Sequence, residues 1–269
     1  MKKLIWLIIL FPILFAGVSL DGVDDYVKVA ATGVADFEPA KKLSVSMWIK
    51  RTGACENWAD LFAKAINNGT TNPYHSWSLQ CDDISDTDYI VNITCNGVRG
   101  ETSAITLLPN TTDWVHIVVT FDRNGGDQPI VIVYKDGASV LNETLIVTGN
   151  ITYEADANEG DVFFGAEGTT GTNSGAYQYS EISYWKDIVL TPAEVGVLYS
   201  SRLKRMPLQI QSSSLKLYLP MLDEIDGSSA DGDTFQDESG NGNNGTGDDG
   251  ARNDNCTAKA EEILSYPGN

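Results

Sequence analysis

Residues 237–247, with the sequence DESGNGNNGTG, decide how the rest of the chain can be arranged. Gly and Asn favour tight turns, because Gly tolerates positive φ angles and Asn hydrogen-bonds to its own backbone. A strand pattern precedes this turn-rich stretch, since Leu215, Leu217 and Leu219 alternate with more polar residues. The end of the chain therefore contains a predicted strand and a turn-rich stretch. The function of the protein depends on which strands this part pairs with.

Strand patterns also dominate the chain before this block. Apolar and polar residues alternate over residues 43–50 and again over residues 115–121. The pair Asp136-Gly137 separates two apolar runs, which is a strong signal for a β-hairpin. Turn residues recur about every ten positions. The sequence therefore predicts a sandwich of antiparallel strands.

One short helix is predicted close to the end of this region. Thr191, Pro192 and Glu194 have the spacing of a capping box with Pro at the first helical position. Val195 and Leu198 then follow at helical spacing.

Four segments together resemble laminin G-like members of the concanavalin A-like lectin and glucanase superfamily. They are residues 19–29 (SLDGVDDYVKV), 114–122 (WVHIVVTFD), 185–194 and 237–247. The resemblance implies an all-β fold, a jelly-roll β-sandwich of two antiparallel sheets with one short helix. In that family the segment similar to residues 237–247 opens the domain, whereas here it comes last. The order implies a circularly permuted jelly roll, or a terminal segment that completes a neighbouring copy.

The resemblance also divides the chain into regions. Residues 1–18 are predicted as a signal peptide or a retained N-terminal anchor, because Lys2 and Lys3 precede an apolar run that continues to Leu20. The protein is therefore expected to be secreted or to lie at the cell surface. The laminin G-like domain is expected over residues 19–269, with a main part (19–201), a connector (202–214) and a permuted strand block (215–269).

The charge of the chain is strongly acidic, with a formal net charge of -19. Nucleic acids and anionic membranes are therefore poor partners. Residues 221–250 contain nine carboxylates and no Lys or Arg. Such a block is either a solvated loop or a binding site for a divalent cation. Oxygen ligands beside a Gly turn favour Ca²⁺, and the predicted structural calcium site consists of Asp237, Asn241 and, by the family arrangement, Asp24.

Exposed aromatic rings are candidates for carbohydrate binding, because they offer flat apolar faces to sugar rings. The candidates are Trp58, Tyr74, Tyr177 and Tyr179. Trp58 and Tyr74 lie next to turn residues, where exposure is expected. The expected partners are glycans or cell-surface glycoproteins.

The sequence offers little support for a catalytic site. Glu224 and Asp226 begin the E-x-D-x-x-E pattern of one family of glycoside hydrolases, but Ser229 stands where the second Glu belongs. Only His75 and His116 are available for nucleophilic chemistry, and no G-x-S-x-G motif is present. The protein is therefore expected not to be an enzyme, with a glycoside hydrolase as a minor alternative.

Four cysteines in an exported protein allow three disulfide pairings. If residues 57–64 and 74–81 form a hairpin, Cys55 and Cys81 meet at one rim. A third strand returning over residues 89–95 puts Cys95 about 20 Å from Cys81, too far for a bridge. This geometry predicts Cys55–Cys81 and, by elimination, Cys95–Cys256.

Seven N-x-S/T sequons indicate a glycosylated surface protein, although Asn-rich loops produce the same pattern without glycans. They begin at Asn68, Asn92, Asn110, Asn142, Asn150, Asn244 and Asn255. Together, these features predict a secreted, non-enzymatic carbohydrate-binding or adhesion module with structural calcium. The alternative is a structural subunit of an extracellular assembly, a homo-oligomer formed by exchange of the C-terminal strands.

Overall fold

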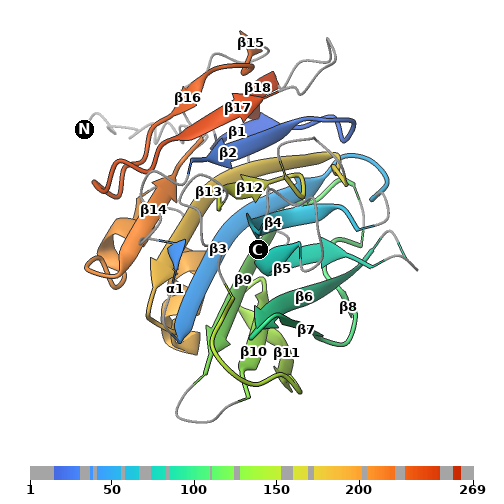
Figure 1. Ribbon diagram of the computed structural model, residues 1–269. Coiled ribbons are helices and arrows are strands. Elements are labelled where there is room, and N and C mark those ends of the chain that lie inside the picture. Colours follow the sequence, from blue (N-terminus) through green and yellow to red (C-terminus); the bar gives the residue numbers. More distant parts are fainter. Residues whose placement is uncertain are drawn as a thin grey trace, which may run out of the picture.

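A computed structural model shows two antiparallel β-sheets packed face to face, as the jelly-roll prediction requires (Figure 1). The structure describes residues 15–30, 37–38, 41–55, 58–66, 74–82, 85, 87–109, 111–123, 128–152, 160–168, 173–201, 205–221, 228–248 and 257–261.

The first sheet, called sheet A, is built around two long central strands that pair with each other, β3 (Lys42–Arg51) and β13 (Tyr177–Lys186). In spatial order its strands are β11 (Ala138–Thr144), β10 (Ile130–Lys135), β9 (Val115–Asp122), β3, β13, β1 (Phe15–Ser19), β18 (Thr257–Glu261) and β15 (Ser228–Ser229), with β14 (Leu215–Leu219) also paired to β13.

The second sheet, called sheet B, faces sheet A across the core. Its strands in order are β16 (Thr234–Phe235), β17 (Gly245–Asp248), β2 (Tyr26–Val29), β12 (Val162–Phe164), β4 (Asp60–Ala65), β5 (His75–Cys81), β6 (Asp88–Cys95) and β7 (Val98–Glu101), with β8 (Ile105–Thr106) paired to β6.

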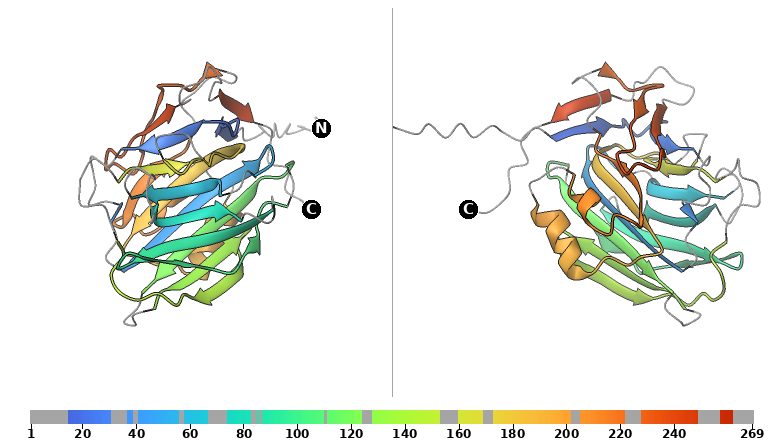
Figure 2. Two further views of the ribbon diagram at one scale, coloured as in Figure 1. Left: turned by 45° about the vertical axis from the view of Figure 1, so that its right-hand side comes forward. Right: turned by 90° about the vertical axis from the view of Figure 1, so that its left-hand side faces the viewer.

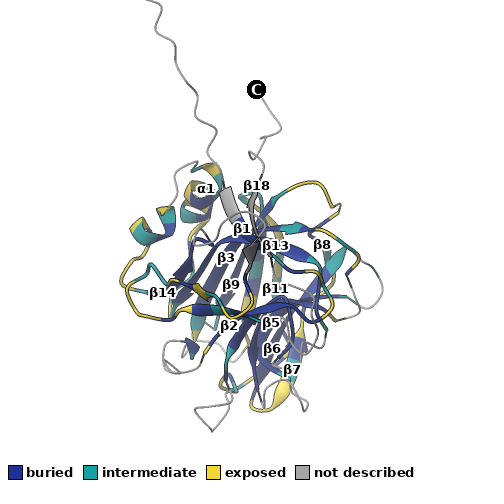
Figure 3. Cartoon of the chain, turned by 90° about the horizontal axis from the view of Figure 1, so that it is seen from above, coloured by how far each residue is buried: buried dark blue, intermediate teal, exposed yellow. Residues whose placement is uncertain are grey.

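The main core lies between the sheets, where alternate residues of each strand meet (Figure 3). Val45 and Met47 of sheet A belong to the same buried cluster as Leu79 and Val91 of sheet B. Because side chains alternate along a strand, the polar residues between these positions lie on the outer faces.

The helix α1 (Pro192–Ser200) packs on the outer face of sheet A (Figure 2). The predicted capping box is present, since Thr191 accepts from the Glu194 N–H and Glu194 accepts from the Thr191 N–H. Val195 and Leu198 of the helix form a second buried cluster with Trp185. The 3₁₀ helix η3 (Met206–Gln209) lies beside it. No helix in the described ranges combines the length and apolar character needed to cross a membrane.

The C-terminal block pairs with strands of its own chain. β14 extends sheet A beside β13, and β17 extends sheet B beside β2. A Cβ atom on Gly247 would lie 2.2 Å from the carbonyl oxygen of Ala230, so the close approach of these two backbone segments requires glycine at this position. The block therefore completes both sheets, as expected for a permuted jelly roll.

The N-terminal strand β1 begins at Phe15, inside the range predicted as a leader. Its partner strands are β13 and β18, and Val18 is fully buried opposite Tyr179. Residues 1–14 lie outside the described ranges.

One half of the cysteine prediction is confirmed. Cys55 and Cys81 form a disulfide with a Cα–Cα distance of 6.4 Å, and the β4–β5 hairpin has the expected direction, with Lys64 opposite Trp77. Cys95 is buried and forms no disulfide within the described ranges, while Cys256 lies outside them. The predicted Cys95–Cys256 bridge falls outside the described residues and stays a prediction.

The sequons differ in accessibility. Asn92 is only 1% exposed, and its amide nitrogen donates to Gln80 and Ser78, so the folded protein has no room for a glycan there. Asn142, Asn150 and Asn244 are exposed. The remaining three, Asn68, Asn110 and Asn255, lie outside the described residues.

Candidate functional site

The outer face of sheet B carries an unusual number of polar residues on strand β5. Trp77, Leu79 and Cys81 belong to the core cluster. Since successive side chains point to opposite faces, Ser78 and Gln80 lie on the other side of the sheet. Both are buried, which indicates that neighbouring segments enclose this face.

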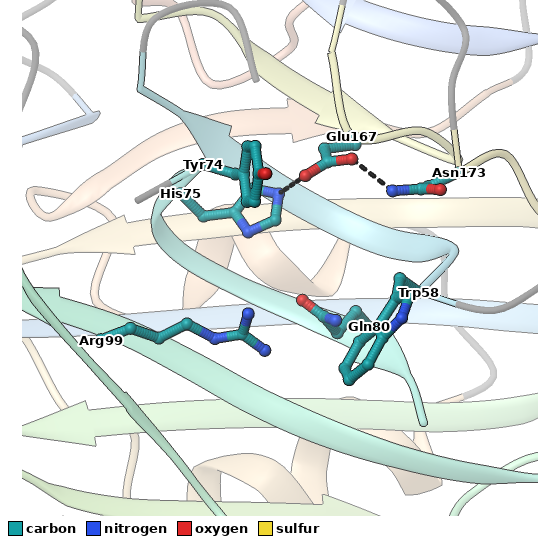
Figure 4. A pocket seen from close by; sticks show the side chains of 7 residues that line it. All are labelled: Trp58, Tyr74, His75, Gln80, Arg99, Glu167 and Asn173. Atoms are coloured by element: carbon teal, nitrogen blue, oxygen red, sulfur yellow. Dashed lines mark hydrogen bonds and ion pairs between the residues drawn. The ribbon is translucent and has the colours of Figure 1, made fainter. Parts of the chain in front are cut away.

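Seven side chains surround a cavity of about 310 Å³ at this face (Figure 4). They come from the approach to β4, from β5, from β7 and from the segment between β12 and β13. They are Trp58, Tyr74, His75, Gln80, Arg99, Glu167 and Asn173.

Trp58 is the exposed aromatic of this group, with 36% of its surface accessible. It lies three residues after Cys55, whose disulfide to Cys81 ties the start of β4 to the end of β5. Its φ angle of 67° falls in the left-handed region, which is rare for a bulky side chain. The indole is therefore held at the rim of the cavity by its surroundings rather than by its own backbone preference.

A cluster of buried ionisable side chains forms one wall of the cavity. The Nε2 atom of His75 lies 3.1 Å from Oδ2 of Asp60 and 3.5 Å from Oε1 of Glu167. Asn173 donates its side-chain amide to the other oxygen of Glu167. Figure 4 shows His75, Glu167 and Asn173 at the same end of the cavity.

Burial is the largest influence on the pKa values of these three groups. It raises the pKa of the Asp60 and Glu167 carboxyls, because a low-dielectric site disfavours the charged form. Burial also opposes the charged imidazolium of His75, but the attraction of Asp60 and then of Glu167 outweighs it, so the pKa of His75 is raised. The three groups therefore exchange protons as one coupled unit.

Arg99 forms the opposite wall. Its Nε donates to Oδ1 of Asn92 at 2.8 Å, and its Nη2 lies 3.0 Å from Oε2 of Glu101. The guanidinium carbon lies 5.6 Å from the centre of the Trp58 ring, within the range of a cation–π contact. The guanidinium points toward Gln80 and Trp58 (Figure 4). A cation is therefore fixed beside the exposed indole.

The structure brings together two of the four aromatic residues predicted to bind sugars. Trp58 and Tyr74 both line the cavity. Tyr177 and Tyr179 are 0% exposed and belong to the core cluster, and the hydroxyl of Tyr179 donates to the Leu61 carbonyl. These two predictions are corrected, because a ring in the core offers no face to a ligand from solvent.

The other five lining residues were not identified from the sequence. Gln80 had a usable signal, since it alternates with Leu79 and Cys81 on β5 and must face outward. His75, Arg99, Glu167 and Asn173 come from separate segments, so no spacing rule brings them together.

The predicted calcium ligands lie in two places. Both oxygens of Asp237 accept hydrogen bonds inside the protein, from the N–H groups of Tyr218, Ser239 and Asn243 and from the Ser239 hydroxyl. Asn241 donates to the Leu215 carbonyl. These contacts join the turn to β14, so Asp237 organises the loop.

Asp24 belongs to a different acidic cluster. Oxygen atoms of Asp21, Asp24 and Asp25 all lie within 4.8 Å of one another. Strand β2 pairs with β17 so that Tyr26 faces Asp248 and Val29 faces Gly245. Asp24 precedes Tyr26, whereas the N–H of Asp237 donates to Asn244 at the other end of this ladder. The ladder itself is about 10 Å long at ~3.3 Å per residue, and Asp24 and Asp237 lie beyond its opposite ends.

Comparisons with known proteins agree with the fold. A family model described as the concanavalin A-like lectin/glucanases superfamily matches residues 21–196. No curated protein sequence matches the chain.

Similar solved structures include a native heptameric SAP-like pentraxin from Limulus polyphemus, with 16% identity, a TM-score of 0.49, and coverage of 71% of this chain and 84% of that chain. The receptor binding domain of botulinum neurotoxin mosaic serotype C/D has 13% identity and a TM-score of 0.47, with 70% of this chain and 45% of that chain covered. The binding domain of botulinum neurotoxin serotype G has 14% identity, a TM-score of 0.46, and coverage of 74% and 47%.

The chain thus spans less than half of the two toxin chains, and the likeness to them concerns the fold alone. The family match is stronger, because it covers well over half of the chain and includes Trp58, His75 and Arg99. This chain belongs to the concanavalin A-like lectin and glucanase superfamily.

Proposed function

We propose that the protein is a non-enzymatic carbohydrate-binding module, and that the cavity between Trp58 and Glu167 is its binding site. The observation that carries this proposal is the exposed indole of Trp58 at the rim of a cavity lined by hydrogen-bonding groups. Membership of a superfamily of lectins and glucanases supports carbohydrate as the general class of ligand.

The chemistry of the lining fits a sugar ring. A pyranose has apolar C–H faces, which pack on aromatic rings, and an equator of hydroxyl groups, which need donors and acceptors. Trp58 and Tyr74 supply the rings, while Gln80, Glu167 and Asn173 supply both kinds of polar partner. A cavity of about 310 Å³ has room for one or two sugar units.

The arrangement of the carboxylates favours binding over hydrolysis. A glycoside hydrolase needs two carboxyl groups that flank the scissile bond. Asp60 and Glu167 both contact the same nitrogen of His75. A glycosidic bond between them would have to displace this buried imidazole, and Asp60 is 0% exposed.

Binding to an array of neutral and acidic glycans, with and without EDTA, tests the proposal. We expect binding to at least one glycan class and a loss of at least about tenfold in Trp58→Ala, because aromatic anchors dominate such sites. Ile146→Ala is the matched control, since it removes an apolar side chain that is 90% exposed and is not among the residues that line the cavity. Unchanged binding in Trp58→Ala would refute this location of the site.

We also propose a structural Ca²⁺ ion on the acidic residues before β2. The close approach of Asp21, Asp24 and Asp25 supports it, because three carboxylates repel one another unless a cation lies between them. Saturating Ca²⁺ at a hundredfold excess over Kd would add ~2.7 kcal/mol of stability. The melting temperature should rise in Ca²⁺ relative to EDTA and should lose this response in Asp21→Asn/Asp24→Asn. Asp231→Asn, at an exposed acidic position, is the control.

Export from the cell completes the proposal. The apolar run after Lys2 and Lys3 and the Cys55–Cys81 disulfide both support an extracellular location. Expression with residues 1–14 intact should place the protein outside the cytoplasm, and N-terminal sequencing of the recovered protein would locate the cut. Recovery only from the cytoplasm would contradict this part.

A further inference from the structure

Arg99 differs from the other paired cations that the structure describes. Arg205 pairs with Glu238 on the surface with 65% of its side chain exposed, and Lys42 pairs with Asp122. Arg99 is 29% exposed and lines the cavity. It is also held from two sides, by the Asn92 amide oxygen and by the Trp58 ring.

The guanidinium still has hydrogen-bonding capacity directed at the cavity. Nε donates to Asn92, whereas Nη2 lies within ion-pair distance of Glu101 and makes no hydrogen bond within the described ranges. Within the described ranges, no residue bonds to Nη1 of Arg99. Glu101 is 57% exposed, so its contact with Arg99 is open to exchange with solvent or with a ligand.

The carboxylates at the other wall form their ion pairs with His75 rather than with Arg99. Glu167 and Asp60 are both within ion-pair distance of the same nitrogen of His75, so the two carboxyls share one imidazole. Asn173 donates to Glu167 as well. The wall at Glu167 therefore presents hydrogen-bond acceptors to sugar hydroxyls, whereas the wall at Arg99 presents a guanidinium that points toward Gln80 and Trp58 (Figure 4).

We propose that the cavity selects sugars that carry a carboxylate, such as uronic acids, and that Arg99 sets this preference. The inference rests on the proposed carbohydrate-binding function and extends it to the ligand class. A guanidinium binds a carboxylate through two parallel N–H groups, which is a short and geometrically specific contact. The sugar ring would then pack on Trp58 while its hydroxyls reach Gln80 and Asn173.

The charge of the whole chain makes this preference a local property. With a formal net charge of -19, the protein repels anions at long range. Affinity for an acidic sugar therefore has to come from a cation at the site itself. Non-specific attraction to polyanions is not an alternative explanation for a positive result.

The test uses the full chain and two matched pairs of probes, glucuronate with glucose and galacturonate with galactose, titrated by ligand-observed NMR. Wild-type protein should bind each uronate about tenfold more tightly than its neutral partner. Arg99→Gln should remove the uronate preference, lowering uronate binding about tenfold more than it lowers glucose and galactose binding. Arg99→Lys should recover part of the difference, because it keeps the charge and loses the bidentate geometry.

Two further variants keep the test decisive if Arg99→Gln folds poorly. Glu101→Gln removes the competing carboxylate at an exposed position, so it should strengthen uronate binding severalfold without affecting glucose. Arg205→Gln, which removes a surface cation, should change neither affinity. Raising the salt concentration should weaken uronate binding alone.

The outcomes separate this inference from the proposed function. Binding of the neutral sugars with no uronate preference, or an equal loss of both in Arg99→Gln, would overturn the role of Arg99 and leave carbohydrate binding standing. Failure of every sugar to bind, in protein shown to be folded by its melting curve, would overturn both.

Discussion

Trp58 combines an exposed ring with a backbone conformation that costs free energy. A non-Gly residue in the left-handed region is disfavoured by roughly 1–2 kcal/mol, and only the surrounding structure holds it there. The disulfide at Cys55 and the Arg99 contact provide such support. The strain is therefore located at the residue that presents the binding surface.

Comparing two substitutions at Trp58 isolates this strain. Trp58→Ala and Trp58→Gly both remove the indole, but only Gly adopts a positive φ without a steric penalty. We expect Trp58→Gly to be more stable than Trp58→Ala by about 1 kcal/mol in urea unfolding, with sugar binding lost in both. Equal stability of the two variants would show that the backbone relaxes after the ring is removed.

His116 gives the protein a sensitivity to acid that lies far from the cavity. It is 2% exposed between sheet A and α1, with Nε2 3.0 Å from the Ser46 hydroxyl. Burial lowers the pKa of His116 to about 3 from its ordinary value of 6.5. Between these pH values the unfolded chain binds one proton more than the folded chain, so stability falls as the pH falls.

Replacing His116 should flatten that part of the pH dependence. We expect wild-type protein to lose more free energy of unfolding between pH 7 and pH 5 than His116→Gln does. Asp60, His75 and Glu167 have raised pKa values and act in the opposite direction, but they are present in both proteins and cancel in the comparison. The same loss in both proteins would mean that His116 is protonated in the folded state.

The sequence identified individual site residues only where local context was informative. Trp58 and Tyr74 lie next to turns, and both line the cavity. Tyr177 and Tyr179 alternate with Gln178 and Ser180, so the two rings share one face of a strand, and the structure shows that this face is buried. Which of two alternating faces is buried depends on the sheet that packs against it, and the sequence does not specify that sheet.

At the scale of elements, the helix α1 shows how far local rules extend. Its capping box, its Pro at the first turn and its buried Val195 and Leu198 all follow from local sequence. The turn at Asp237 shows the limit. Its acidic and Gly-rich sequence indicated a metal site, whereas its carboxylate accepts N–H groups from β14 and from the turn itself. Metal binding and acceptance of backbone N–H groups both need carboxylate oxygens in the same kind of turn. Composition alone therefore does not distinguish the two roles.

Removing the cap of α1 should lower stability without touching the ligand site. Thr191→Ala deletes the acceptor for the Glu194 N–H, and we expect a loss of about 1 kcal/mol in the free energy of unfolding. Thr191→Ser keeps an acceptor and should lose much less. Sugar binding should be unchanged, because α1 packs on sheet A and the cavity lies on sheet B. A binding defect in Thr191→Ala would show that the helix supports the site.

At the scale of the whole molecule, the permuted order means that one late segment closes both sheets. Leu217 and Leu219 of β14 are fully buried in the main core, and β17 covers the edge of β2. The sequence predicted this sandwich because strand alternation and the family segments survive permutation. It did not predict the cavity, since His75, Arg99 and Glu167 meet only after the sheets are assembled.

Separating the block from the rest of the chain tests its role. A chain that ends after Ser214 should lack cooperative unfolding, because it exposes the core under β14 and the edge of β2. Addition of a peptide of residues 215–250 should restore a cooperative transition, whereas the same peptide with Leu217→Asp should not. A truncated chain with the melting temperature of the intact protein would contradict this role.

The same experiment bears on the prediction of a strand-exchanged assembly. Intact protein in which the block pairs with its own chain should have the mass of one subunit at all concentrations. Oligomers that grow with protein concentration and disappear on truncation would instead support exchange between copies.

The late position of β14 and β17 has a consequence for the timing of synthesis. Strand β13 ends at Lys186, but its neighbour β14 and the cover of β2 are made later. At ~5–20 residues per second, translation leaves these edges without partners for several seconds. Open edges of this kind recruit strands from other nascent chains. We therefore expect the yield of native protein to fall as the growing chains come closer together, even where the finished fold is stable.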